Sequence, residues 1–219
     1  MRKTALLAGA TGLVGSHLLK LLLNDESYTK VKIVSRKPFP QKHPKLENHL
    51  IDFDDLHNYT AILQADDAFC CLGTTIAKAG TKDAFFKVDY TYIHEFAKTA
   101  LEGGAKQFTL VSSVGANAES SAFYLQVKGK LENDIVKLHY PTFNILRPSM
   151  LLGERTEVRT GELIGKTLMP LFSIFMQGPF KKYRAIQAAT VAKAMLTIAK
   201  NPKEGVNIYE SDEIELTGG

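Results

Sequence analysis

Cysteine is scarce in this chain of 219 residues, which holds only Cys70 and Cys71, side by side. Neighbouring cysteines do not easily form a disulfide, so no disulfide framework is expected. A reducing compartment fits this usage, and we expect the cytoplasm. Both cysteines lie in an apolar stretch, and we interpret them as core residues rather than redox centres.

Long apolar runs are lacking as well. The longest stretch away from the N-terminus, residues 168–176, contains Pro170 and is too short to span a bilayer. The charged start of the chain leads into an apolar run that glycines soon cut short, and no small-residue cleavage site follows. We therefore expect neither a signal peptide nor an integral membrane segment.

The sequence shows no strong bias of charge and no metal-ligand spacing. The formal net charge is +4, and lysine and arginine are dispersed along the chain, so nucleic-acid binding is not indicated. The densest basic spot, residues 181–184, favours a solvated loop over a binding patch. The six histidines lack metal-ligand spacing, so no metal is expected. Without a repeat or linker, the chain suits one domain with an ample core.

Against these absences stands a glycine motif, Gly-x-x-Gly-x-x-Gly, formed by Gly9, Gly12 and Gly15. It lies between an apolar run at 5–8 and an apolar-periodic helix at 13–23. Glycine permits positive φ and a close approach of ligand to backbone. The amides that begin the helix suit an anion such as a pyrophosphate. This context predicts a dinucleotide site; the alternative is a plain strand–helix turn.

The end of the second predicted strand, residues 31–35, bears on the choice of nucleotide. Dinucleotide sites that bind NAD carry an acidic residue there, which bonds the ribose 2′-hydroxyl. Here the strand ends in Ser35, Arg36 and Lys37. A hydroxyl and two cations favour the extra 2′-phosphate of NADP. The alternative is a solvated basic loop.

Strands and helices alternate along most of the chain. Further strands are predicted at 49–51, 67–72, 108–111, 143–146 and 206–209. Helices are predicted from near Leu56, from Asp83 to Leu101, at 122–138 and at 188–200. A loop is predicted at 76–82. This order predicts an α/β fold with a doubly wound parallel sheet and right-handed crossovers. Ligands bind at the carboxyl ends of such strands, which places Leu72 and Gly73 beside the cofactor.

Two regions keep alternatives open. Asp52 either accepts a bond from the adenine amino group or caps the helix that follows. Residues 151–185 have no regular repeat and form a candidate substrate cover. An apolar stripe in that region fits either the core or a dimer face equally well.

A hydroxyl, a phenol and an ammonium are predicted to meet at the carboxyl edge of the sheet. Ser113 ends the fifth strand, while Tyr124 and Lys128 lie four apart on the next helix and share a face. A phenol is a poor acid or base at neutral pH, and a nearby ammonium favours its ionised form. These groups suit carbonyl reduction: Tyr124 supplies the proton, Ser113 holds the carbonyl oxygen, and Lys128 tunes Tyr124 and binds ribose. The alternative for Tyr-x-x-x-Lys is an ordinary helix surface.

At these motifs the chain resembles an atypical branch of the short-chain dehydrogenase/reductase superfamily, with a Rossmann fold. The resembling segments are Gly-Ala-Thr-Gly-Leu-Val-Gly (9–15), Val-Ser-Ser-Val-Gly-Ala (111–116), Tyr-Leu-Gln-Val-Lys-Gly (124–129) and Leu-Arg-Pro-Ser (146–149). Phe-Cys-Cys-Leu-Gly-Thr-Thr (69–75), Lys-Ala-Gly (78–80), Val-Asp (88–89) and Arg-Thr-Gly-Glu (159–162) narrow the likeness to the Tat-interacting-protein-like oxidoreductases.

The resemblance implies an NADPH-binding protein with contacts along the whole cofactor. They are Thr11, Gly12, Leu13 and Val14 in the turn, Arg36 and Lys37 at the 2′-phosphate, Leu72 and Gly73 beside the adenosine half, Tyr124 and Lys128 at the nicotinamide ribose, and Leu151 and Arg159 beyond the sixth strand. Arg159 would act as a second phosphate clamp.

Two functional hypotheses follow. The first is an NADP(H)-dependent oxidoreductase that reduces a small carbonyl compound. The second is a redox-sensing regulator that binds NADPH and acts through a protein partner, and a homodimer is compatible with both. An epimerase fits the fold but finds little room in residues 151–185.

Overall fold

The computed structural model describes residues 2–153 and 183–219 and shows one domain built on a seven-stranded sheet. The strands are β1 (Lys3–Ala8), β2 (Tyr28–Ser35), β3 (Leu46–Leu50), β4 (Asp67–Cys70), β5 (Gln107–Val111), β6 (Thr142–Arg147) and β9 (Gly205–Glu210). Their order is β3-β2-β1-β4-β5-β6-β9, and each neighbouring pair is parallel. The predicted doubly wound parallel sheet is therefore confirmed. The strand order reverses direction between β1 and β4, where such folds bind ligands.

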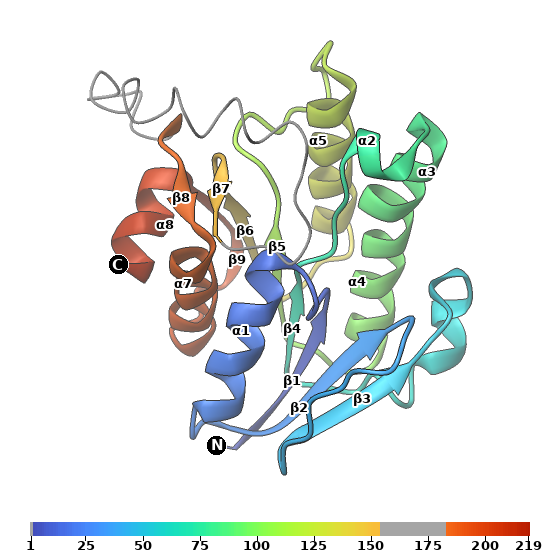
Figure 1. Cartoon of the computed structure of the whole chain (residues 1–219), viewed down its shortest axis with the longest axis vertical. Coiled ribbons are helices and arrows are strands. Elements are labelled where there is room, and N and C mark those ends of the chain that lie inside the picture. Colours follow the sequence, from blue (N-terminus) through green and yellow to red (C-terminus); the bar gives the residue numbers. More distant parts are fainter. Residues whose placement is uncertain (1, 154–182) are drawn as a thin grey trace.

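Helices cover both faces of the sheet (Figure 1). One face carries α1 (Leu13–Asn24), α7 (Ala188–Lys200) and α8 (Ser211–Gly218); the other carries the 3₁₀ segment η1 (Phe53–Tyr59), α4 (Tyr92–Glu102) and α5 (Phe123–Val136). The side chains of β1 alternate between the two cores: Ala5 and Leu7 face α1 and α7, while Leu6 and Ala8 face α4. Because both faces are covered, the inner strands are apolar almost throughout.

The segment between β4 and β5 differs from the prediction. A short helix, α2 (Ile76–Ala79), replaces the expected loop. The expected single helix from Asp83 to Leu101 is α3 (Lys82–Phe86), a π-helical turn η2 (Lys87–Thr91) and α4. The sequence pattern suggested Asp83 as the cap of this helix, but the Thr81 hydroxyl caps α3 by accepting a hydrogen bond from the Ala84 amide at 3.1 Å, and Asp83 lies in the first turn. A π turn inserts one extra residue into the helix and so changes which side chains face inward.

The C-terminal part contains elements that the sequence did not predict. Short strands β7 (Leu151–Leu152) and β8 (Ile186–Gln187) pair in parallel, and α8 follows β9 directly. The candidate substrate cover, residues 151–185, begins with β7 and ends just before β8, and residues 154–182 of it fall outside the described residues. The cover therefore stays a prediction.

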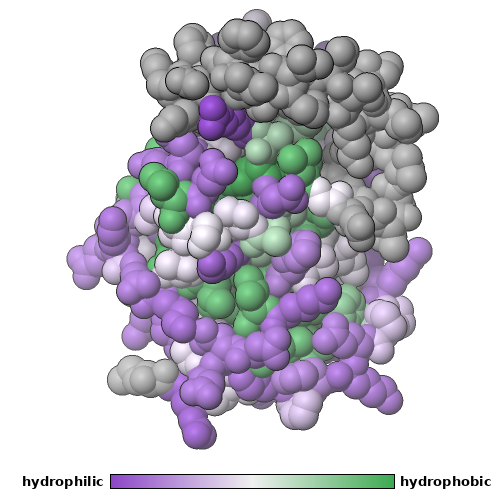
Figure 2. Space-filling model, turned by 60° about the vertical axis from the view of Figure 1, so that its left-hand side comes forward, coloured by the Kyte–Doolittle hydropathy of each residue, from purple (hydrophilic) through white to green (hydrophobic). Residues whose placement is uncertain are grey.

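The surface on the side of α7 and α8 is mixed. Figure 2 shows apolar residues there in patches that hydrophilic side chains separate. Within the described ranges, no helix combines the length and the apolar character that crossing a membrane requires.

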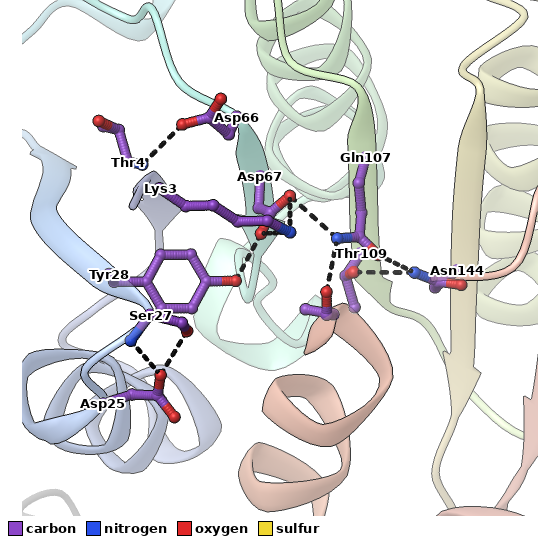
Figure 3. Close-up of polar contacts among 11 residues, drawn as sticks. Lys3, Thr4, Asp25, Ser27, Tyr28, Asp66, Asp67, Gln107, Thr109 and Asn144 are labelled. Atoms are coloured by element: carbon purple, nitrogen blue, oxygen red, sulfur yellow. Dashed lines mark hydrogen bonds and ion pairs between the residues drawn. The ribbon is translucent and has the colours of Figure 1, made fainter. Parts of the chain in front are cut away.

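Buried polar groups gather at the amino ends of the strands (Figure 3). The Asp67 carboxylate accepts hydrogen bonds from the Tyr28 hydroxyl at 2.5 Å, the Lys3 ammonium at 3.0 Å and the Gln107 amide at 3.0 Å. The Asn144 amide donates to the Gln107 oxygen at 3.1 Å. Five strands thus meet in one connected network, which we call the amino-edge network.

Candidate cofactor and active site

The glycine turn after β1 is closed so tightly that side chains would not fit. Gly9 has φ of +85°, and a Cβ there would lie 2.5 Å from the backbone of Cys71. A Cβ at Gly15 would lie 2.1 Å from the Gly9 carbonyl oxygen. The Gly12 amide donates to that oxygen at 2.9 Å. The glycines therefore bring the start of α1 against the end of β4, as a dinucleotide turn requires.

The start of α1 is left open for an anion. Its N-cap is Gly12, no side chain caps the helix, and no acidic residue lies in the first turn. Thr11 is exposed and Leu13 is half-buried, whereas Val14 packs into the core. The free amides and the positive end of the helix dipole thus fit a pyrophosphate group.

The end of β2 presents two cations beside this turn. Arg36 and Lys37 are exposed. The Ser35 hydroxyl lies 2.7 Å from the Lys37 carbonyl oxygen and 2.8 Å from the Asn48 side-chain oxygen. These bonds shape the corner after β2, which lies next to β1 in the sheet.

Asp52 acts as a helix cap. Its Oδ1 accepts a hydrogen bond from the Asp54 amide at 2.9 Å, at the start of η1. The capping interpretation is therefore what the structure shows, and a contact with adenine stays a prediction.

The two serines after β5 have different surroundings. Ser112 is buried, and its hydroxyl donates to the Glu132 carboxylate, which also binds Arg147 through two hydrogen bonds at 2.5 and 3.2 Å. Ser113 is half-buried, and among the described residues its hydroxyl makes one long hydrogen bond, donated to the Val114 carbonyl oxygen at 3.4 Å. Ser113 is thus the serine whose hydroxyl remains available to a ligand.

Tyr124 and Lys128 lie on one face of α5, as predicted. The Lys128 ammonium is 6.0 Å from the centre of the Tyr124 ring. Tyr124 is half-buried and packs against the Phe85 ring, with the centroids 5.7 Å apart. Lys128 is 3% exposed and forms an ion pair with Asp89 at 2.7 Å. The ordinary-surface alternative for this Tyr-x-x-x-Lys pair is therefore wrong for Lys128.

Lys128 reaches the end of β4 through Gly73. Gly73 is exposed, and a Cβ built on it would lie 3.3 Å from an Asp89 oxygen and 3.8 Å from the Lys128 nitrogen. Leu72, before it, is half-buried and packs against the core under α4 and α5. The glycine turn, the end of β4, Ser113 and the Tyr124–Lys128 face thus lie along one carboxyl edge.

Asp89 is the site residue that the sequence analysis missed. It lies on η2 and is 1% exposed. The Val-Asp string contained it, but a regular helix from Asp83 gives no reason to turn it toward Lys128. The π turn supplies that reason, and such turns are frequent at functional sites.

The cysteines behind this edge are unreactive. Burial raises the pKa of the Cys70 thiol to about 12 and that of Cys71 well above its usual value. Both thiols are therefore protonated and poor nucleophiles at neutral pH. This supports the interpretation of both as packing residues.

Two predicted cofactor contacts lie near or in the cover. Leu151 is half-buried on β7, and the neighbouring Gly153 packs against Leu13 at the start of α1. Arg159 falls outside the described residues. Among the residues that the structure does describe, no group of three or more histidine, cysteine or acidic side chains could hold a metal.

Comparison with protein families decides the family. Residues 9–202 match a family model described as NAD(P)H-binding. The chain belongs to this NAD(P)H-binding family. Within it, the chain is an atypical short-chain dehydrogenase/reductase. It is 35% identical over 207 residues to rat Protein HTATIP2, covering 93% of this chain and 84% of the relative.

A fungal relative and solved structures agree with this membership. The chain is 37% identical over 222 residues to "Protein FMP52-1, mitochondrial" from Scheffersomyces stipitis, covering 96% of each. It resembles MoeE5 in complex with UDP-glucose and NAD, with a TM-score of 0.71, 16% identity, and coverage of 96% of this chain and 79% of that one. It also resembles the Bordetella bronchiseptica enzyme WbmH in complex with NAD+, with a TM-score of 0.72 and 14% identity. That match covers 96% of this chain and 76% of WbmH. At these identities the structures show the fold alone.

The names of the fungal relatives overturn the expected cytoplasmic location. FMP52 proteins from Scheffersomyces, Debaryomyces and Candida are named as mitochondrial. The expectation rested on two unpaired cysteines, and reduced thiols do not distinguish one reducing compartment from another.

Proposed function

We propose that this chain is an NADP(H)-dependent oxidoreductase that reduces a small carbonyl compound. The observation that carries the proposal is the meeting of an uncapped glycine turn with Ser113, Tyr124 and the buried Lys128 at one sheet edge. Membership of the NAD(P)H-binding family supports the nucleotide, and the side chains support the reaction.

The residues fit the nucleotide in three places. The open amides at the start of α1 would hold the pyrophosphate. Arg36 and Lys37 would hold the 2′-phosphate. Lys128, beneath Gly73, would bind the nicotinamide ribose. When bound, the reduced nicotinamide supplies a hydride.

Two side chains of the protein would bind and protonate the carbonyl oxygen of the substrate. The Ser113 hydroxyl would donate a hydrogen bond to it, and the Tyr124 hydroxyl would transfer its proton as the carbonyl carbon accepts the hydride. The oxygen thereby becomes an alcohol hydroxyl, and the tyrosinate regains its proton from water. The Lys128 ammonium would stabilise the negative charge that Tyr124 carries in between.

Fluorescence titration with NADPH and, separately, NADH tests the nucleotide. We expect NADPH to bind at least about tenfold more tightly, because a charge-assisted contact to the extra phosphate is worth about 1.5–3 kcal/mol. An Arg36→Ala, Lys37→Ala double variant should lose this preference and keep NADH affinity. Lys20→Ala, an exposed lysine on α1, is the control.

The outcomes separate the parts of the proposal. Equal affinity for both nucleotides, or a preference for NADH, would make the 2′-phosphate assignment wrong and leave the reductase. Binding of neither nucleotide would sink the proposed function altogether.

The names of the FMP52 relatives also support a mitochondrial location for this chain. Fractionation of the source cells, with the chain followed by antibody, would test it. Recovery away from the mitochondrial fraction would contradict it.

A further inference from the structure

A buried ion pair lies directly behind the candidate site and is not explained by packing. One Asp89 oxygen is 2.7 Å from the Lys128 nitrogen, and the other accepts a hydrogen bond from the Thr74 amide at 2.7 Å. The side chains of Lys128 and Asp89 are 4% and 1% exposed. Moving two charges out of water costs several kcal/mol each, so such a pair is a weak source of stability. Its position beneath Gly73 points to a role at the site.

The backbone around Asp89 is built to present this carboxylate. The π turn η2 interrupts an otherwise α-helical segment and carries Asp89 at its centre. The Thr74 amide belongs to the loop that leaves β4, so Asp89 joins three elements: η2, that loop and α5. Both carboxylate oxygens are thereby directed at fixed partners.

The charged state of Lys128 depends on Asp89. The groups that face the Lys128 ammonium are the Asp89 carboxylate from η2, the Tyr124 phenol from α5 and the Cys70 thiol from β4. Burial by itself would lower the pKa of Lys128, but the attraction of Asp89, aided by Tyr124 and Cys70, raises it above its usual value. Without Asp89, a buried lysine favours its neutral form.

We propose that Asp89 is a positioning residue that holds the Lys128 ammonium beneath Gly73, charged and directed toward the nicotinamide ribose. The part about the ribose rests on the proposed function. The part about the charge rests on the ion pair alone. Asp89 does not touch the substrate in this proposal, and it acts through Lys128.

A titration of Lys128 tests the charge without any cofactor. Lysines labelled with carbon-13 at the ε position are followed by NMR against pH, and the Lys128 signal is assigned by its absence in Lys128→Arg. In the wild type we expect Lys128 to titrate above the exposed lysines. In Asp89→Asn, which keeps the shape and removes the charge, the midpoint should fall by about one to three pH units.

The control is Asp25→Asn. Asp25 pairs with Lys200 at 2.8 Å beyond the far end of α1, so this variant also removes a carboxylate from a lysine. It should leave the Lys128 midpoint unchanged. An unchanged midpoint in Asp89→Asn would overturn the proposal. If Asp89→Asn does not fold, a wild-type Lys128 that titrates at or below the exposed lysines overturns it instead.

NADPH titration at several pH values tests the link to the cofactor. Asp89→Asn should bind about tenfold more weakly above its lowered Lys128 midpoint and recover toward wild-type affinity below it. A merely structural loss would not recover as the pH falls. Affinity that is weak at every pH, or unchanged at every pH, would overturn the positioning role. A wild type that binds no NADPH would instead overturn the proposed function.

Discussion

The two ends of the sheet treat polar groups in opposite ways. At the amino edge, the side-chain donors of the network around Asp67 are used within the protein, and Asn144 Oδ1 is the acceptor left without a hydrogen bond from the described residues (Figure 3). At the carboxyl edge, the amides of α1 have no side-chain cap and the Ser113 hydroxyl has one long bond. Buried polar groups are normally satisfied, so unused donors mark the edge where a ligand completes the bonding.

A lysine–aspartate contact at each edge shows the same difference. Lys3 keeps a 30% exposed side chain beside Asp67, so water shares in its stabilisation. Lys128 is enclosed with Asp89 and lies next to an exposed glycine. The Lys3–Asp67 pair supports the fold. The Lys128–Asp89 pair instead holds a buried positive charge at the edge where we propose that the cofactor binds.

Replacement of Tyr124 by phenylalanine at the carboxyl edge should have the largest effect, and it should change activity rather than stability. The variant loses the proton donor, so reduction of any carbonyl compound that the wild type accepts should slow by about 10²–10⁴-fold, with NADPH affinity kept. Unfolding by denaturant should change by less than about 1 kcal/mol, because the hydroxyl lies in a half-buried position. Consumption of NADPH against a panel of carbonyl compounds measures the rate.

Tyr209→Phe on the outermost strand β9 is the matched control, and it should keep full activity. Equal rates in Tyr124→Phe and the wild type would contradict the catalytic role. A wild type that binds NADPH and reduces no compound of the panel would favour the alternative of a redox-sensing regulator that acts through a protein partner.

Removal of the Asp67 carboxylate should have the opposite outcome. Asp67→Ala leaves the Tyr28 hydroxyl and the Gln107 amide buried without their acceptor, while the half-exposed Lys3 regains water. We expect a loss of about 3 kcal/mol in the free energy of unfolding, measured by urea denaturation. NADPH affinity of the remaining folded protein should stay unchanged. Asp66→Ala, at the exposed neighbour, should cost far less, and an equal loss in both variants would refute the network's role.

The sequence predicted the carboxyl edge better than the amino edge, for a physical reason. The change from an apolar run to glycines and then to helical periodicity at residues 5–23 is local, and so are Ser113 and the Tyr124–Lys128 spacing. Parallel topology then brings these segments to one edge. The amino-edge network joins Tyr28, Asp67 and Gln107 from distant strands, and no local pattern indicates that these three side chains meet.

Asp89 was missed for a different reason. A π turn and an α-helix have the same composition and differ by one hydrogen-bond register, so periodicity alone cannot place the insertion. The sequence favoured Ser113 over Ser112, but the different surroundings of the two serines are visible only in the structure, because Glu132, which engages Ser112, lies further along the chain on α5. The expected cytoplasmic location was wrong because cysteine usage indicates the redox conditions of a compartment and does not identify the compartment.

The pH dependence of the unfolding free energy that Asp25 contributes should be the smallest of these effects. It tests whether a carboxylate near the amino edge serves the stability of the fold. Burial opposes ionisation of Asp25, but hydrogen bonds from Lys200 and Ser27 outweigh it and lower its pKa to about 2, from 3.8. The ionised group therefore stabilises the fold above pH 3.8, and this contribution disappears as the pH falls through about 2. The difference in unfolding free energy between wild type and Asp25→Asn, measured by denaturant titration, should shrink over that interval. A difference that stays constant from neutral pH to pH 2 would show that the Lys200 contact carries no net stabilisation, because the charge would then be irrelevant to the fold.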